Sequence, residues 1–386
     1  MHMMSFGASR RQVLVGKIRT VAQDRPLRLS CGKDIADIPV AYQTYGTLNE
    51  AKDNAILICH ALTGDQYVAS GNPVTGKAGW WNFMVGSGKP IDTDRFFVIC
   101  SNVLGGCMGT YGPKHHDAEG NVLGLNFPVV TIRDMVAVQQ RLIESFGITQ
   151  LFAVIGGSVG GMQVLQWAVD FPNMVRCVIP MATAARHNAQ NIAYHEIGRQ
   201  AIMADPDWQD GAYHDAGTFP VKGLSIARMT AHVTYLSENA LQHKFGRMLQ
   251  HGDVLDFSFD ANFQVESYLR HQGVSFVERF DPNSYLYVTK AADYFDLAQP
   301  HDGALSLAFA HTPVSFCLLS FTTDWLYPTM ETRHIVRALN AQGADVSFAE
   351  IDSPYGHDAF LMEDTHIMNV LGGFLDGKAK KFGVGV

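Results

Sequence analysis

The stretch Leu151 to Asp170, LFAVIGGSVGGMQVLQWAVD, constrains the fold of this chain more than any other segment. Its apolar beginning, Leu151 to Ile155, is typical of a buried parallel strand, and its end has apolar residues at helical spacing. Between them, Gly156, Ser158 and Gly160 fill the pattern G-x-S-x-G. A strand, a glycine-flanked serine and a helix in this order predict a nucleophile elbow.

An elbow of this kind presents its serine to a substrate. Glycines on both flanks allow the neighbouring backbone to approach closely, so the turn can be sharp. The turn lifts the Ser158 hydroxyl above the edge of the sheet, next to the free N–H groups and the positive dipole end of the following helix. A glycine-rich strand–helix turn with a bystander serine is the alternative, and the flanking strand and helix favour the nucleophile.

Strand-like and helix-like segments alternate on both sides of the elbow. This alternation predicts an α/β fold, with a mostly parallel central sheet and helices on both faces. Continuous or alternating apolar residues predict strands at 38–45, 55–59, 95–101, 151–155, 174–181, 314–321 and 346–351. Helices are expected at 79–83, 128–146, 331–342 and 365–375.

The alternation stops near residue 184 and resumes near residue 314. The intervening sequence is polar-aromatic, largely helical in pattern and too long for a loop. We therefore expect a helical lid insertion at 185–300, within an α/β core formed by 36–184 and 301–386. Residues 1–35 are expected to form an N-terminal arm and a first strand region.

Composition limits the partners and the compartment of the 386-residue chain. Its net charge of −8 does not favour nucleic acid or an anionic membrane, and the absence of long apolar runs predicts no transmembrane helix. The six cysteines form no C-x-x-C pair, which indicates free thiols in a reducing compartment, the cytoplasm. The first residues lack the features of a secretory signal and predict a short solvated arm, with a transit peptide as the alternative.

A serine is a weak nucleophile until a base accepts its proton, and a carboxylate usually orients that base. In this fold the three residues follow the order serine, acid, histidine. Asp324 follows the predicted strand 314–321, and His357 follows the next one, so both should lie at the edge of the sheet beside Ser158. Asp324 as a helix N-cap and His357 as an exposed loop residue are the alternatives. The rival bases are His60 and His334, and the rival acids are Asp352 and Asp358.

Two backbone amides are expected to form an oxyanion hole. One is the N–H of Val159, the residue after the predicted nucleophile, and the other is the N–H of Leu62, in the loop after strand 55–59. No metal site is expected, because the adjacent pair His115 and His116 has no partners at ligand spacing. The residues thus predict a serine-nucleophile enzyme of the α/β-hydrolase fold with a large lid, either a hydrolase or a transferase.

A set of motifs is spread in order over the chain after residue 35. They are CHALTGD (59–65), NVLGGCMGTYGP (102–113), FPVVTIRDMV (127–136), VIGGSVGGMQVLQW (154–167), ARMTAHVTYLS (227–237), TTDWLYP (322–328) and YGHDAFL (355–361). Together they resemble the homoserine O-acetyltransferase family of methionine biosynthesis. The family usually has Met where this chain has Val159, and a small residue where it has Tyr111. Only the backbone of Val159 is required, whereas Tyr111 is expected to alter the shape of the pocket.

The resemblance implies roles and substrates beyond those the residues themselves predict. It implies that Ser158, Asp324 and His357 are the catalytic triad, and that Arg228 and Asp358 bind the carboxylate and the ammonium of L-homoserine. It further implies acetyl-CoA as the co-substrate, no bound cofactor, and a homodimer with lid helices at its interface.

The acyl group is predicted from one position. Relatives that use succinyl-CoA tend to have arginine shortly after the triad aspartate, where this chain has Leu326. An apolar residue offers no partner to a succinyl carboxylate, so acetyl is favoured over succinyl. The remaining alternatives are another amino-acid acceptor such as serine, an esterase that releases the acyl group to water, and a non-catalytic binding protein of the same fold.

Overall fold

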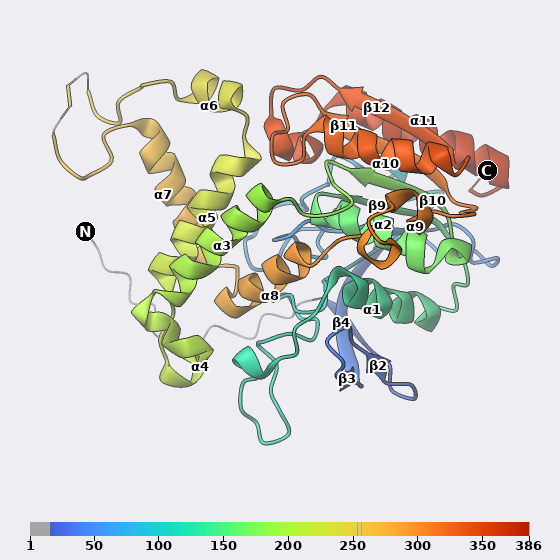
Figure 1. Cartoon of the computed structure of the whole chain (residues 1–386), viewed down its shortest axis with the longest axis horizontal. Helices are drawn as coiled ribbons and strands as arrows, with labels where there is room; N and C mark the ends of the chain where they lie inside the picture. Colours follow the sequence, from blue (N-terminus) through green and yellow to red (C-terminus); the bar gives the residue numbers. More distant parts are fainter. Residues whose placement is uncertain (1–15, 253, 256, 386) are drawn as a thin grey trace.

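The computed structural model describes residues 16–252, 254–255 and 257–385, and its centre is an eight-stranded sheet (Figure 1). The strand order is β1-β4-β8-β5-β9-β10-β11-β12. Neighbours from β8 to β12 are parallel, whereas β4 is antiparallel to both β1 and β8. The strands are β1 (Lys17–Val21), β4 (Ile38–Tyr45), β5 (Ala55–Cys59), β8 (Phe97–Ser101), β9 (Leu151–Gly157), β10 (Val175–Met181), β11 (Ser315–Phe321) and β12 (Asp345–Ile351).

The predicted α/β fold with a mostly parallel sheet is confirmed. Two short strand pairs lie outside the sheet, β2 (Leu27–Arg28) with β3 (Asp34–Ile35), and β6 (Val85–Gly86) with β7 (Ile91–Asp92). The first part of the expected N-terminal arm, residues 1–15, lies outside the described residues.

Side chains of the central strands alternate between two apolar layers. In β5, Leu57 and Cys59 join one buried cluster, and Ile56 and Ile58 join the other. The first cluster includes α1 (Ile132–Ser145), α2 (Val159–Asp170) and α10 (Thr329–Ala341); the second includes α11 (Thr365–Phe382). The central strands are apolar on both sides, so both faces of the sheet must be covered, and helices cover them.

One sequence prediction of local structure is wrong. Residues 79–83 form turns, not a helix. The indole N–H of Trp81 donates to the Phe360 carbonyl (2.7 Å), and that of Trp80 donates to the Asp65 carbonyl (2.9 Å). A helix of five residues would gain few internal hydrogen bonds. The two indole hydrogen bonds therefore determine the conformation of this segment instead.

Between β10 and β11 the chain leaves the sheet, and most of its described residues there are helical. These helices gather beside the sheet in Figure 1, with α5 packed between α3 and α7. They are α3 (Ala189–Met203), α4 (Tyr213–Ala216), α5 (Val221–Tyr235), α6 (Glu238–Lys244), α7 (Gln264–Val277) and α8 (Pro282–Asp293), and the short α9 (Leu305–Ala308) follows. No helix of the described chain is both long and apolar enough to cross a membrane.

Candidate active site

Ser158 lies on a sharp turn between β9 and α2. Its backbone has φ 59° and ψ −127°, a conformation that is strained for any residue other than glycine. The turn leaves no space for side chains on its flanks, since a Cβ on Gly156 would lie 2.7 Å from the Cys59 carbonyl oxygen. The same backbone blocks a Cβ on Gly160. The glycines predicted for an elbow are thus required by packing.

The structure brings Ser158, His357 and Asp324 together in a hydrogen-bonded chain. The Ser158 Oγ lies 2.8 Å from His357 Nε2, and His357 Nδ1 lies 2.8 Å from Asp324 Oδ2. All three side chains are buried, although they come from loops far apart in the sequence. His357 is in the 3-10 turn η5 (Gly356–Leu361), beyond β12, and Asp324 lies in the turn after β11.

Backbone amides hold the Asp324 carboxylate toward His357. Its second oxygen, Oδ1, accepts from the N–H groups of Leu326 (3.0 Å) and Tyr327 (2.9 Å). Burial lowers the pKa of His357, but the charge and hydrogen bond of Asp324, with the charge of Asp358, outweigh it and raise that pKa above its ordinary value. The imidazole can therefore accept a proton from Ser158, since the resulting cation is stabilised.

The rival histidines and one rival acid lie elsewhere. His334 is exposed on α10, and Asp352 is exposed and accepts from the Thr322 hydroxyl. His60 is buried at the start of the loop after β5, where its Nδ1 pairs with the Ala61 carbonyl (2.8 Å) and its Nε2 accepts from the Val103 N–H (3.2 Å). These hydrogen bonds support the loop, and none of those that the described residues form with the His60 ring involves Ser158.

Leu62 and Val159, whose amides are predicted to form an oxyanion hole, line one cavity together with Ser158. Within the described part of the chain, neither backbone N–H donates a hydrogen bond. Val159 is the first residue of α2, so its amide has no intrahelical acceptor. Both N–H groups therefore lack a protein acceptor among the described residues.

Arg228, in α5, and Asp358, in η5, lie close enough for their charges to interact, and the charge of Asp358 also interacts with that of His357. The Arg228 guanidinium lies over the rings of Phe276 (4.7 Å) and Tyr235 (5.5 Å), and Nη1 donates to the Thr63 hydroxyl (3.3 Å). Its Nε is buried and has no hydrogen-bond partner among the described residues. Burial raises the pKa of Asp358, and the charges of His357 and Arg228 oppose this increase. An unsatisfied guanidinium and a half-buried carboxylate are suited to a zwitterionic ligand.

The cavity over Ser158 is small, about 30 Å³. Leu326 lines it, as do residues of α3, α5 and α8. Tyr111 is not among its lining residues; it packs edge-on against His115 and Phe127, so the expectation that it shapes this pocket is not supported. The space accommodates a group about the size of a methyl or a water molecule.

Sequence reasoning missed a buried polar cluster behind the acid loop. Asp293 Oδ1 lies 2.7 Å from His195 Nδ1 and 3.3 Å from His187 Nδ1, and His187 Nε2 lies 2.5 Å from the Tyr327 hydroxyl. The spacing of the two histidines and Asp293 would suit a metal ion. However, Arg199 lies 2.7 Å from the same carboxylate, and its fixed charge opposes a second cation. The cluster instead anchors Tyr327, and the only sequence signal for it is the motif TTDWLYP.

The fold and this geometry define a protein of the α/β-hydrolase class, and a family model for the alpha/beta hydrolase fold matches residues 54–363. The chain is 60% identical over 366 residues to a homoserine O-acetyltransferase of Rhodospirillum rubrum. The matched residues cover 95% of this chain and 94% of the relative. The chain belongs to the homoserine O-acetyltransferase family.

Solved structures agree with this assignment and add a second activity among the neighbours. The homoserine O-acetyltransferase from Bacillus anthracis superimposes with a TM-score of 0.83 at 28% identity, covering 93% of this chain and 97% of that one. Esterase E22 superimposes with a TM-score of 0.84 at 29% identity, covering 93% and 99%.

Proposed function

We propose that this protein transfers the acetyl group of acetyl-CoA to the side-chain hydroxyl of L-homoserine, a step of methionine biosynthesis. The observation that carries the proposal is the Ser158–His357–Asp324 chain, which faces a small cavity with free amides in a member of this family. We propose these residues as the catalytic triad, acetyl-CoA as co-substrate and no bound cofactor.

In the first half-reaction, His357 Nε2 takes the hydroxyl proton of Ser158, and the oxygen attacks the thioester carbonyl carbon. The N–H groups of Leu62 and Val159 stabilise the oxyanion of the tetrahedral intermediate. The carbon–sulfur bond then breaks, and the thiolate leaves with the proton from His357. Ser158 keeps the acetyl group as an ester, with its methyl in the small cavity.

In the second half-reaction, Arg228 binds the carboxylate of homoserine and Asp358 binds its ammonium. These contacts place the homoserine hydroxyl beside His357, which accepts its proton as the oxygen attacks the acetyl ester. The bond to Ser158 breaks, and Ser158 recovers a proton from His357. Residues of α3, α5 and α8 around the cavity limit access of water, which would otherwise hydrolyse the ester.

An esterase is the second candidate, because esterase E22 has the same fold over nearly the whole chain. The two functions differ in the fate of the acetyl group. Thiol release from acetyl-CoA, measured with and without homoserine, separates them. We expect release to accelerate with homoserine, with O-acetylhomoserine as product and parallel double-reciprocal plots. Full-rate release without homoserine would support the esterase.

Arg228→Lys is expected to raise the KM for homoserine about 10–100-fold, because lysine cannot form the bidentate pair with a carboxylate. Acetylation of Ser158 by acetyl-CoA alone should change much less, and rapid-quench measurements of each half-reaction test this. Arg337→Lys, an exposed arginine on α10, is the matched control. An unchanged homoserine KM would remove Arg228 from the acceptor site.

Leu326→Arg is expected to raise the ratio of kcat/KM for succinyl-CoA to that for acetyl-CoA by about tenfold. The arginine provides a partner for the succinyl carboxylate and crowds the cavity that holds the acetyl methyl. The matched control Leu326→Met, which conserves volume, should keep the preference for acetyl-CoA. Steady-state kinetics with both donors measure the ratio, and an unchanged ratio in the arginine variant contradicts the assignment.

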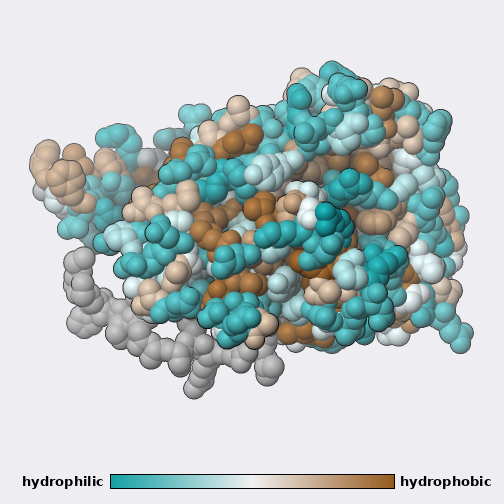
Figure 2. All heavy atoms as spheres, turned by 60° about the horizontal axis from the view of Figure 1, so that its bottom comes forward, coloured by the Kyte–Doolittle hydropathy of each residue, from teal (hydrophilic) through white to brown (hydrophobic). Residues whose placement is uncertain are grey.

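We also propose that residues 185–300 act as a lid and that its helices form a homodimer interface. Apolar side chains are exposed on three adjacent helices, and brown hydrophobic atoms interrupt the hydrophilic surface over this half of the molecule (Figure 2). Light scattering of the wild-type protein should give the mass of a dimer. The double variant Ile197→Asp/Ile226→Asp should give the mass of a monomer. A monomeric wild-type protein would contradict this. The exposed residues are Ile192 and Ile197 of α3, Ile226 and Val233 of α5, and Val274 of α7.

We propose the cytoplasm as the site of action. All six cysteines are free thiols, five of them buried, as is usual where thiols stay reduced.

A further inference from the structure

A second, larger cavity of about 320 Å³ adjoins the loop that carries Leu62. Alternate residues of this loop line different spaces: Leu62 faces the small cavity, whereas Ala61 and Thr63 face the larger one. Arg228 also lines the larger cavity, where its Nη1 donates to the Thr63 hydroxyl. We call the larger space the outer pocket.

The outer pocket has a positive charge on an acidic protein. Three cationic side chains, Lys77, Arg228 and Arg279, line it together with one carboxylate, Asp65. The formal excess is two positive charges, although the whole chain has a net charge of −8. A local field of this sign favours an anionic ligand.

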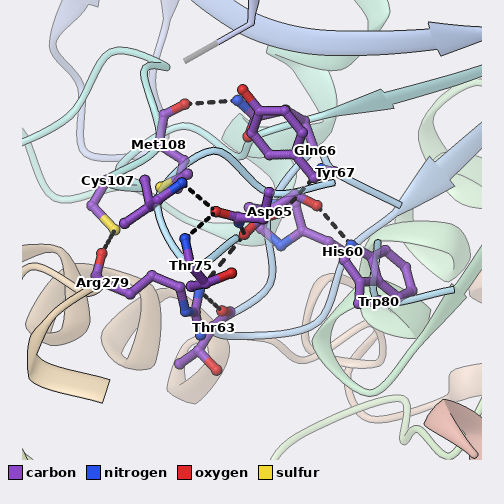
Figure 3. A network of polar contacts seen from close by, with 12 residues as sticks. His60, Thr63, Asp65, Gln66, Tyr67, Thr75, Trp80, Cys107, Met108 and Arg279 are labelled. Carbon is purple, nitrogen blue, oxygen red and sulfur yellow. Dashed lines mark hydrogen bonds and ion pairs between the residues drawn. The ribbon is translucent and has the colours of Figure 1, made fainter. Parts of the chain in front are cut away.

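The single carboxylate is already satisfied by protein groups. Asp65 accepts from the Asn72 amide (2.7 Å) and from the Tyr67 N–H (2.9 Å). Arg279 lies 3.8 Å from the same carboxylate (Figure 3). Arg279 also donates to the Thr63 carbonyl (2.8 Å), so it connects the pocket wall to the loop that carries Leu62. Asp65 and Arg279 thus largely neutralise each other.

Lys77 differs from these paired groups. It is exposed at the rim of the outer pocket, and its ammonium has no ion pair or hydrogen bond to any residue that the structure describes. Half-buried Trp80 lines the pocket as well, and its indole N–H is fixed on the Asp65 carbonyl. The pocket therefore combines a free cation at its mouth with a fixed aromatic wall.

The chemistry at Ser158 determines what this pocket receives. In the tetrahedral intermediate, the carbon holds the serine oxygen, the oxyanion, the methyl and the sulfur, which diverge from one another. With the oxyanion at Leu62 and Val159 and the methyl in the small cavity, the sulfur must leave toward another space. The outer pocket adjoins the loop that carries Leu62 and is large enough for the extended group attached to the sulfur.

We propose that the outer pocket binds the phosphate-bearing arm of the acyl donor, with Lys77 contacting a phosphate group at the rim. This inference rests on the proposed function for the identity of the donor, coenzyme A. Because Arg228 lines the same pocket, the donor arm and the amino-acid acceptor occupy overlapping space. The thiol must then leave before homoserine binds, which accounts for two separate half-reactions.

Calorimetric titration with coenzyme A, and with pantetheine as a phosphate-free probe, tests the inference on the full chain. Lys77→Glu is expected to weaken coenzyme A binding about tenfold, and Lys77→Ala less, because a charge next to a phosphate is reversed or removed. Pantetheine affinity should change less than twofold. Lys380→Glu, an exposed lysine on α11, is the control for net charge.

Equal coenzyme A affinity in Lys77→Glu and wild type would overturn the inference and leave the proposed function intact. An equal loss for pantetheine and coenzyme A would also overturn it, because it would indicate damage to the pocket instead of a lost phosphate contact. Wild-type protein that does not bind coenzyme A contradicts the inference directly. If binding follows the expected pattern but no O-acetylhomoserine forms, only the proposed acceptor fails.

Discussion

Ser158→Ala is expected to lower kcat for acetyl transfer by about 10⁴–10⁶-fold, the range found when a serine nucleophile is removed from a triad. The reason is that His357 Nε2 lies 2.8 Å from the Ser158 Oγ, so the hydroxyl is the group positioned to receive the acetyl group. Removing it leaves the proposed oxyanion amides and the proposed acceptor site in place but eliminates the proposed covalent intermediate.

Intact-protein mass spectrometry measures this directly. Wild-type protein incubated with acetyl-CoA but without homoserine should gain one acetyl group, located on the peptide that contains Ser158. The alanine variant should gain none there. Ser87→Ala is the control, because Ser87 is an exposed serine whose hydroxyl donates to Asp94. Acetylation or near-normal turnover in Ser158→Ala would exclude this serine as the acyl carrier.

Local patterns in the sequence predicted the elbow because its determinants are local. A buried strand, glycines that no side chain can replace, and a helix occupy consecutive residues, so one short stretch specifies the turn at Ser158. Asp324 and His357 were also predictable, since each follows a strong strand and parallel strands end at the same edge of the sheet.

Contacts over long sequence distances were not predictable in this way. The turn at Trp80 and Trp81 depends on a carbonyl of Phe360, far along the chain, and an apolar GWWNF segment alone does not distinguish it from a helix. Likewise, Asp293 and His187 meet behind Tyr327 only because α8 packs against α3. Neither helix has a sequence motif that predicts this packing. The roles of Arg228 and Asp358 came from family resemblance, since isolated charged residues carry no local signal.

Asp324→Asn is expected to lower kcat by about 10⁴-fold while the fold is preserved. The Asn oxygen can accept from the N–H groups of Leu326 and Tyr327, as Asp324 Oδ1 does, which turns the amide NH₂ toward His357. His357 Nδ1 must then act as acceptor, so its proton moves to Nε2. In this tautomer Nε2 points its hydrogen at Ser158 and cannot accept the serine proton.

The same substitution should move the pH dependence of the enzyme. In the proposed mechanism the neutral imidazole is the active base, so wild-type kcat/KM should fall as the pH decreases through the pKa of His357, which lies above the ordinary histidine value. Without the Asp324 charge, burial lowers that pKa, and the acidic limb of the residual activity should shift to lower pH. Asp352→Asn, an exposed acid, is the matched control. Activity within tenfold of wild type, or an unmoved acidic limb, would show that Asp324 does not orient and charge-stabilise the base.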